Sequence, residues 1–225
     1  MFNELIPNVI ELTPDLIKAL KETLIMVGSA GLYGTLIGLP LGVIMLVTGK
    51  NHILENKYLY SILSKLINTI RSIPFVILIA AIPGLIRAIS GTTIGVKGAI
   101  VPLTIVCIPT MARQIELALI KVDKGIIEAY EAMGFSELQI IFKVILKEGL
   151  GGIIQAITLC LVSLLGFSAI AGTVGGGGLG DFAIRYGYQM FKTDVMIVTI
   201  VILLIFVYIV QGIGDSLYKK CNHNK

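Results

Sequence analysis

The sequence is poor in charge and rich in long apolar stretches. Only 14% of its 225 residues are charged and 56% are apolar, with a mean hydropathy of +0.92; a soluble domain usually carries about 25% charged residues. Such a chain cannot cover a water-facing surface, and its apolar runs reach the roughly 18 to 25 residues that cross a bilayer. These features exclude a soluble enzyme, a secreted disulfide scaffold and a disordered protein, and make the lipid bilayer the first partner.

Residues that usually carry chemistry are also scarce. The cysteines Cys107, Cys160 and Cys221 lie far apart in the sequence, and we interpret them as reduced packing residues. Neither His52 nor His223 has Cys, Asp or Glu at metal-ligand spacing, so no metal site is expected. The sequence contains no G-x-x-x-x-G-K-[ST] motif, so the chain is not expected to bind ATP itself.

Acidic residues are missing from most of the apolar sequence. None occurs at positions 56–115, 149–180 or 195–214, and we interpret all 14 as lying outside the membrane spans. A proton-coupled carrier often uses an intramembrane carboxyl group, so such a secondary carrier is disfavoured. A carrier coupled to sodium ions that bind backbone carbonyls remains an alternative. Paired carboxylates, a histidine cluster or an activated nucleophile would indicate a membrane-embedded enzyme, and the spans contain none of these.

The apolar runs predict an all-α membrane protein with five transmembrane helices in a single domain, residues 1–225. The expected spans cover about 23–47, 58–82, 98–120, 150–171 and 195–217. Thr13 and Pro14 predict the start of the first helix, as N-cap and first helical residue. The acidic residues among positions 1–22 do not fit a cleavable signal peptide, so the first span is expected to be retained. Along that span, small residues would let another helix approach closely: Gly28, Gly31, Gly34 and Gly38.

Lysine and arginine indicate the orientation of these spans. With the N-terminus outside and the C-terminus cytoplasmic, more of them lie on the inner side, as the positive-inside rule requires. The juxtamembrane lysines also account for the net charge of +4, so no nucleic-acid partner is expected. Lys65 lies inside the second run, where we interpret it as reaching back to the interface. Arg71 precedes Pro74, where a kink could line a polar path or contact a partner helix.

The longest polar insertion, residues 121–148, would then be cytoplasmic. Asp123 is placed to cap a helix over about 124–133, Gly134 would end it, and Ser136 with Gln139 has capping-box spacing. The insertion also has more apolar residues than a connecting loop needs: Ile126, Ile127, Tyr130, Met133, Leu138, Ile141 and Phe142. Some of these residues require a partner surface, either the membrane interface or another protein.

A second polar segment follows the fourth span. Residues 175–180 formally contain G-x-G-x-x-G, but they follow a membrane helix and not a strand. We interpret them as a flexible external turn in which glycine permits tight backbone packing, and not as a dinucleotide site.

Within the insertion, Glu128-Ala129-Tyr130-Glu131-Ala132-Met133-Gly134 resembles the EAA loop of permease subunits in bacterial ABC importers. Tyr130 and Val144 are mild departures from the alanine and isoleucine of that pattern. Lys147 replaces its proline, a departure that concerns how the loop ends and the fourth helix begins. Residues 71–78, 166–172, 175–180 and 186–188 look like the methionine importer's permease in particular. The resemblance covers roughly residues 20–217.

The resemblance implies the type I permease fold of ABC importers and a multi-pass protein of the bacterial cytoplasmic membrane. Two copies would form the path for methionine, in L and D forms, and two cytoplasmic ATPase subunits would hold ATP and Mg²⁺, leaving no cofactor on this non-enzymatic chain. An extracytoplasmic methionine-binding lipoprotein would deliver the cargo. Another amino acid or small nutrient as cargo remains an alternative.

The resemblance also implies roles for individual residues. Glu128 and Glu131 would pair with basic groups of the ATPase or cap their helix. The small side chains of Ala129 and Ala132 would keep the loop surface close to the ATPase. A gate near Arg71 and Pro74 is expected to involve the end of the fourth helix: Ser168, Ala169 and Ile170. These three residues could instead simply pack against the fifth helix.

Overall fold

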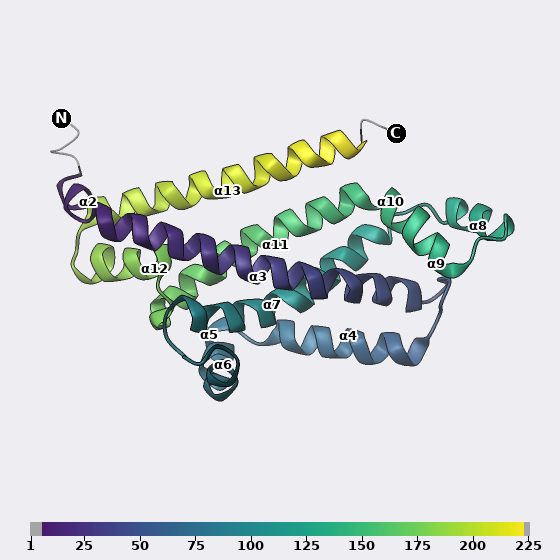
Figure 1. Cartoon of the computed structure of the whole chain (residues 1–225), viewed down its shortest axis with the longest axis horizontal. Coiled ribbons are helices and arrows are strands. Elements are labelled where there is room, and N and C mark those ends of the chain that lie inside the picture. Colours follow the sequence, from purple (N-terminus) through teal and green to yellow (C-terminus); the bar gives the residue numbers. More distant parts are fainter. Residues whose placement is uncertain (1–5, 223–225) are drawn as a thin grey trace. The chain divides into compact units, whose positions relative to one another are not determined.

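The structure is a computed structural model that describes residues 6–222, and every regular element in that range is a helix (Figure 1). The α-helices are α2 (Pro7–Glu11), α3 (Thr13–Thr48), α4 (Lys57–Ser72), α5 (Phe75–Ala81), α6 (Pro83–Ser90), α7 (Gly95–Leu119), α8 (Lys124–Ala132), α9 (Glu137–Ile140), α10 (Leu146–Glu148), α11 (Leu150–Ala171), α12 (Gly178–Phe182) and α13 (Thr193–Asn222). Three short segments have π-type hydrogen bonding: η1 (Ile141–Ile145), η2 (Gly172–Gly176) and η3 (Ala183–Gln189). The backbone of η2 leaves helical geometry at Val174 and Gly175, which form a kink after α11. The predicted all-α class is confirmed.

Four helices within residues 6–222 are long and apolar enough to cross a membrane: α3, α7, α11 and α13. The run expected at 58–82 is not one straight helix, because α4 and α5 meet at a bend of 96° and count as a fifth span only if taken together. Pro74, which has no N–H, lies at the break with ψ of 133°. It also disfavours helical backbone at the preceding residue, Ile73.

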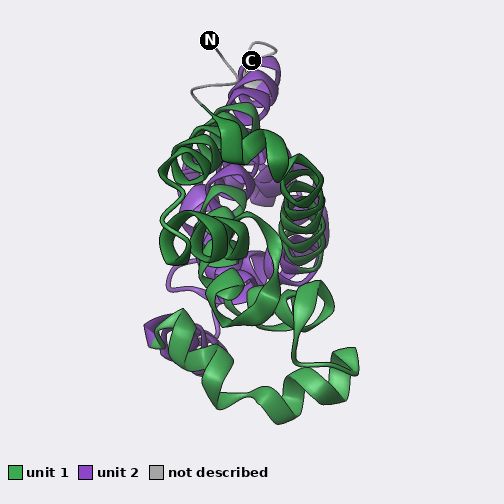
Figure 2. Cartoon of the chain, turned by 90° about the vertical axis from the view of Figure 1, so that its left-hand side faces the viewer, with its two compact units in different colours: residues 1–33, 73–106, 161–210 green, residues 34–72, 107–160, 211–225 purple. Residues whose placement is uncertain are grey.

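The chain forms two compact units, coloured separately in Figure 2. The first comprises residues 1–33, 73–106 and 161–210, and the second comprises residues 34–72, 107–160 and 211–225. By their residue ranges, each of the four long helices contributes residues to both units.

In the first unit, the short helix α2 is tied to the start of α13. Leu179, Phe182 and Val195 form a buried cluster with Val9 and Ala19. The Asn8 backbone and side-chain amides both donate to the Asp194 carboxylate, at 3.0 Å each. The short helix α2 is absent from our sequence prediction, and it changes the expected start of α3.

Thr13 is the first residue of α3 and not its N-cap. Its hydroxyl donates to the Val9 carbonyl oxygen, 3.0 Å away, instead of accepting from a backbone N–H of the first turn. The preceding helix α2 supplies that carbonyl, so the chain enters α3 from another helix and not from an extended cap.

In the second unit, the glycines of α3 bring it against α7. A Cβ atom added at Gly38 would lie 2.7 Å from the Met111 Cβ, and one added at Gly42 would lie 2.6 Å from the Ala112 carbonyl oxygen. Only glycine permits this approach. The predicted close packing is confirmed at Gly38 but not at Gly28, where an added Cβ would meet nothing within 4 Å.

Candidate functional site

The polar insertion folds into two short helices that meet at a glycine, as predicted. Asp123 caps α8 by accepting from the Gly125 N–H at 2.8 Å. Gly134 follows α8 with φ of +81°, which glycine adopts without strain. Ser136 and Gln139 form the expected capping box at the start of α9. The cap of α8 is therefore Asp123, and the alternative that Glu128 or Glu131 caps this helix is wrong.

Two backbone hydrogen bonds and a ring contact stabilise the turn at Gly134. The Gly134 N–H donates to the Glu131 carbonyl at 2.9 Å, and the Phe135 N–H donates to the Tyr130 carbonyl at 3.2 Å. The rings of Tyr130 and Phe135 pack edge to face with centroids 4.9 Å apart. Tyr130, the departure from the alanine of the EAA pattern, thus packs against its own loop.

Some apolar side chains of the loop are buried, and others are exposed. Ile127 and Ile141 are buried within the unit. Met133, Leu138 and Phe142 are each more than 60% exposed. Glu128, Ala129, Glu131 and Ala132 are exposed as well. The loop therefore exposes apolar side chains together with carboxylates, which is chemistry suited to a protein partner with basic and apolar groups.

The interpretation that every acidic residue lies outside the spans is wrong for Glu116. This residue lies in α7 with 5% of its surface exposed, and the Arg113 guanidinium donates to its Oε2 at 2.7 Å. The Tyr60 hydroxyl of α4 donates to its Oε1 at 3.0 Å. The signal was present in the sequence, since Glu116 falls inside the predicted run 98–120, three residues after Arg113. The Tyr60–Glu116 hydrogen bond therefore ties α4 to α7.

The residues expected near a gate lie on different helices and differ in exposure. Arg71 is exposed in the last turn of α4, and Pro74 is exposed at the start of α5. Next to Pro74, the ring of Phe75 contacts that of Phe167 with centroids 5.0 Å apart, which brings the bend beside the end of α11.

At that end of α11, Ser168 is 2% exposed and its hydroxyl donates to the Leu165 carbonyl at 2.8 Å. Ala169 and Ile170 are partly exposed. A Cβ added at Gly180 of α12 would run into the backbone of Ala169. Ser168 thus satisfies its own helix in this conformation, and the gate role of the three residues stays a prediction.

The glycine-rich turn packs against α3. Gly178 has φ of +80°, and its N–H donates to the Glu22 carboxylate at 2.8 Å, while the Leu179 N–H donates to the Thr23 hydroxyl at 2.8 Å. The predicted tight backbone packing is confirmed, but Gly178, Leu179 and Gly180 are buried residues at the start of helix α12 and do not form the expected flexible turn. Our sequence reasoning missed Glu22 and Thr23, because 156 residues separate them from their partners and no local pattern marks the pairing.

Two titratable groups outside the spans have shifted pKa values. Burial lowers the pKa of His52, with the positive charge of Lys124 acting in the same direction and Glu116 opposing it. Burial raises the pKa of Tyr186, and so does the hydrogen bond that its hydroxyl donates to Asp15 at 3.1 Å. Neither group lies against a metal-like cluster, since residues 6–222 contain no group of three His, Cys, Asp or Glu side chains that could hold an ion.

Curated relatives match this chain along almost its whole length. The probable D-methionine transport system permease protein of Vibrio cholerae is 49% identical over 208 residues, which is 92% of each chain. The methionine import system permease protein of Bacillus subtilis is 42% identical over 215 residues, which is 96% of each chain.

Solved structures agree with this fold. The MetNI methionine ABC transporter, in inward-facing conformations, matches with a TM-score of 0.91 and 42% identity over 94% of this chain and 98% of that one. An amino acid ABC transporter with histidines matches with a TM-score of 0.78 over 96% and 98%, but at 21% identity it supports the fold alone. The family model of the inner membrane component of binding-protein-dependent transport systems matches residues 38–222. The chain therefore belongs to this family of inner-membrane transport permeases.

Proposed function

We propose that the chain is the permease subunit of an ATP-driven importer that brings methionine, in L and D forms, across the cytoplasmic membrane. The observation that carries the proposal is the identity of 49% and 42% to two methionine permeases over more than nine tenths of the chain. These alignments are long enough to include the spans as well as the loop at residues 121–148.

The permease would work as a homodimer with two cytoplasmic ATPase subunits and an extracytoplasmic methionine-binding lipoprotein. The absence of a phosphate-loop motif from all 225 residues supports an ATPase on a separate chain, where ATP and Mg²⁺ would bind. The exposed apolar and acidic side chains of residues 121–148 support a docking role for this loop. In that role Glu128 and Glu131 pair with basic groups of the ATPase, while Ala129 and Ala132 allow close contact.

Native mass spectrometry of the tagged chain, purified gently from its own membranes, tests the assembly. We expect two copies of the chain together with two copies of an ATPase. A lone chain, or a homodimer that transports without ATP, would replace the proposal with a secondary carrier.

Uptake by the reconstituted complex tests the cargo. We expect ATP-dependent uptake of labelled methionine, competed by unlabelled L- and D-methionine and not by an equal excess of leucine or glutamine. Competition by these other amino acids with equal strength would leave the ABC importer in place and remove methionine as its cargo.

A further inference from the structure

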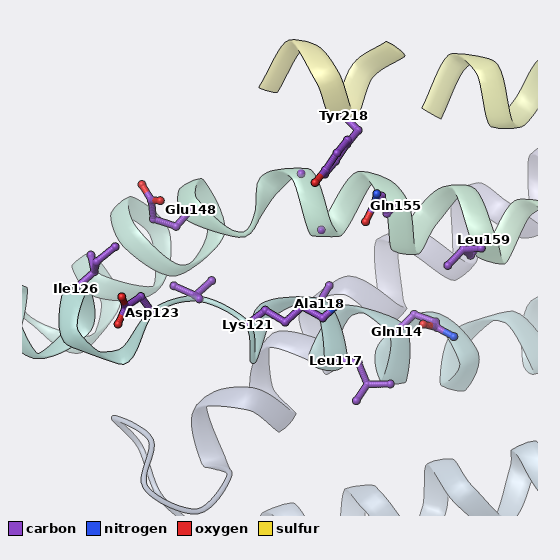
Figure 3. Close-up of a pocket in the computed structure, with 13 residues that line it drawn as sticks. Gln114, Leu117, Ala118, Lys121, Asp123, Ile126, Glu148, Gln155, Leu159 and Tyr218 are labelled. Carbon is purple, nitrogen blue, oxygen red and sulfur yellow. The ribbon is translucent and has the colours of Figure 1, made fainter. Parts of the chain in front are cut away.

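The second unit contains a pocket of about 480 Å³ walled by three membrane helices and the start of the polar insertion. Gln114 comes from α7 and Gln155 from α11, while Tyr218 reaches from α13 toward α11 beside Gln155 (Figure 3). The volume lies within the roughly 300 to 1,000 Å³ of small-molecule sites and leaves room for a small ligand with water.

The two glutamines are the unusual feature of this pocket. Both lie within helices that are apolar enough to span the membrane. Among residues 6–222, neither side-chain amide has a hydrogen-bond partner, and Gln155 is exposed. A polar group inside a membrane span is costly when it faces lipid, and such groups normally face a cavity or another protein group. The two amides therefore indicate a polar cavity and not a lipid-facing groove.

The rest of the lining varies from charged to apolar along the pocket. Lys121, Asp123 and Glu148 contribute charges of both signs at the end near the polar insertion. Leu117 and Leu159 provide apolar surface. A site for an anion or a cation is expected to carry one dominant sign of charge. Mixed charges, amides and leucines together suit a ligand with both charges and an apolar side chain.

We propose that this pocket binds the α-amino acid cargo as a zwitterion, with Gln114 and Gln155 contacting its charged ends before release at the loop. An amide can donate N–H to the carboxylate and can accept from the ammonium group through its carbonyl oxygen. Leu117 and Leu159 then contact the apolar side chain. This inference rests on the proposed function, because it takes its ligand class from it.

Two glycines of α11 let other residues of the pocket wall approach this helix closely. A Cβ atom at Gly151 would lie 3.1 Å from the Tyr218 Cε2, and a Cβ atom at Gly152 would lie 3.1 Å from the Ala118 Cβ. The Gly151→Ala variant therefore displaces the Tyr218 ring from its place in the pocket wall, which should weaken cargo binding without removing either glutamine.

Cysteine protection in the intact complex tests the inference. Gln155→Cys and Gln114→Cys are made in a Cys221→Ser background, because Cys107 and Cys160 are buried and Cys221 is partly exposed. Gln211→Cys is the matched control, an exposed glutamine of α13 outside the pocket. A water-soluble, positively charged methanethiosulfonate is applied from the loop side with and without millimolar L-methionine. We expect methionine to slow labelling at both pocket positions at least several-fold and to leave position 211 unchanged.

Three outcomes overturn the proposal: no labelling at the pocket positions, labelling that methionine does not slow, or equal slowing at position 211. As a second measurement, Gln155→Ala should raise the methionine concentration for half-maximal uptake about 10-fold, as expected for a lost hydrogen bond to a charged group, whereas Gln211→Ala should not. Wild-type uptake of methionine separates the two levels of failure. If the wild-type complex does not take up methionine, the proposed function is wrong. If it takes up methionine but methionine does not protect the pocket cysteines from labelling, only the pocket proposal is wrong.

Discussion

At the scale of single residues, the buried carboxylate of Glu116 illustrates how an ionised group is kept inside an apolar protein. It accepts hydrogen bonds from Arg113 and Tyr60, so both of its oxygens have a donor. Removing one member of such a group leaves the other charge without compensation, which costs more than the pair itself contributes.

We expect Tyr60→Phe to lower the free energy of unfolding by about 1.5 kcal/mol, because it removes one hydrogen bond to a charged acceptor. Glu116→Ala should cost about 2 kcal/mol or more, since Arg113, with a side chain only 26% exposed, then loses its partner. Thermal unfolding of the purified chain in detergent measures both. Equal effects of the two variants would show that the ion pair does not stabilise the fold.

His52 makes stability depend on pH. Its folded pKa lies below the ordinary value of 6.5, mainly because of burial and then because of Lys124, while Glu116 acts in the opposite sense. The folded state thus favours the neutral imidazole of His52. The contribution of His52 to stability is therefore present above its unfolded pKa and is lost as the pH falls through its folded pKa. The thermal unfolding midpoint should fall as the pH is lowered from 8 to 5, and it should fall less steeply for His52→Gln than for the wild-type chain. Parallel curves for the two proteins would contradict this.

At the scale of elements, glycines decide how closely α3 approaches α7 in the second unit. Gly42→Ala places a Cβ 2.6 Å from the Ala112 carbonyl oxygen and 2.7 Å from the Ile115 Cβ, so the helices must separate. Overpacking of this kind costs about 2 kcal/mol. Gly28→Ala is the matched control on the same helix. With nothing within 4 Å, it should be neutral or stabilise by about 0.5 kcal/mol through helix propensity. Comparable losses for both variants in the detergent unfolding assay would refute the packing explanation.

The turn between α8 and α9 depends on conformation and not on space. An added Cβ at Gly134 would meet nothing within 4 Å, but φ is +81°. Asn tolerates this region and a β-branched residue does not. We expect Gly134→Val to remain in the membrane while ATP hydrolysis is uncoupled from uptake, and Gly134→Asn to keep most of the coupling. The ratio of methionine taken up to ATP hydrolysed in proteoliposomes measures this, and full uptake by Gly134→Val would sink the prediction.

At the scale of the whole molecule, the span count and the positive-inside rule predict an external N-terminus and a cytoplasmic C-terminus. The α4 and α5 pair must cross as one bent span for the two ends to lie on opposite sides. A fluorescent protein that matures only in the cytoplasm should therefore be bright when fused after the last residue. Alkaline phosphatase, active only outside, should be inactive at the same position, and the reverse result would place the C-terminus outside.

Local patterns in the sequence determined the elements of this protein. The length of an apolar run decides whether a helix can cross a bilayer, and cap chemistry acts over three or four residues. Asp123, Gly134 and Ser136 could therefore be placed correctly from their neighbours alone. The bend at Pro74 was expected for the same reason, but not its size of 96°.

Only the tertiary structure decided what pairs across long distances in the chain. Tyr60 and Glu116 are 56 residues apart, and Glu22 and Gly178 are 156 apart. The pocket likewise combines Gln114, Gln155 and Tyr218 from three helices. A single glutamine or glutamate within an apolar run shows that a partner or a cavity is needed, because burying it alone is costly. Which partner it finds depends on how the helices pack, and that is set by the summed contacts of the whole fold.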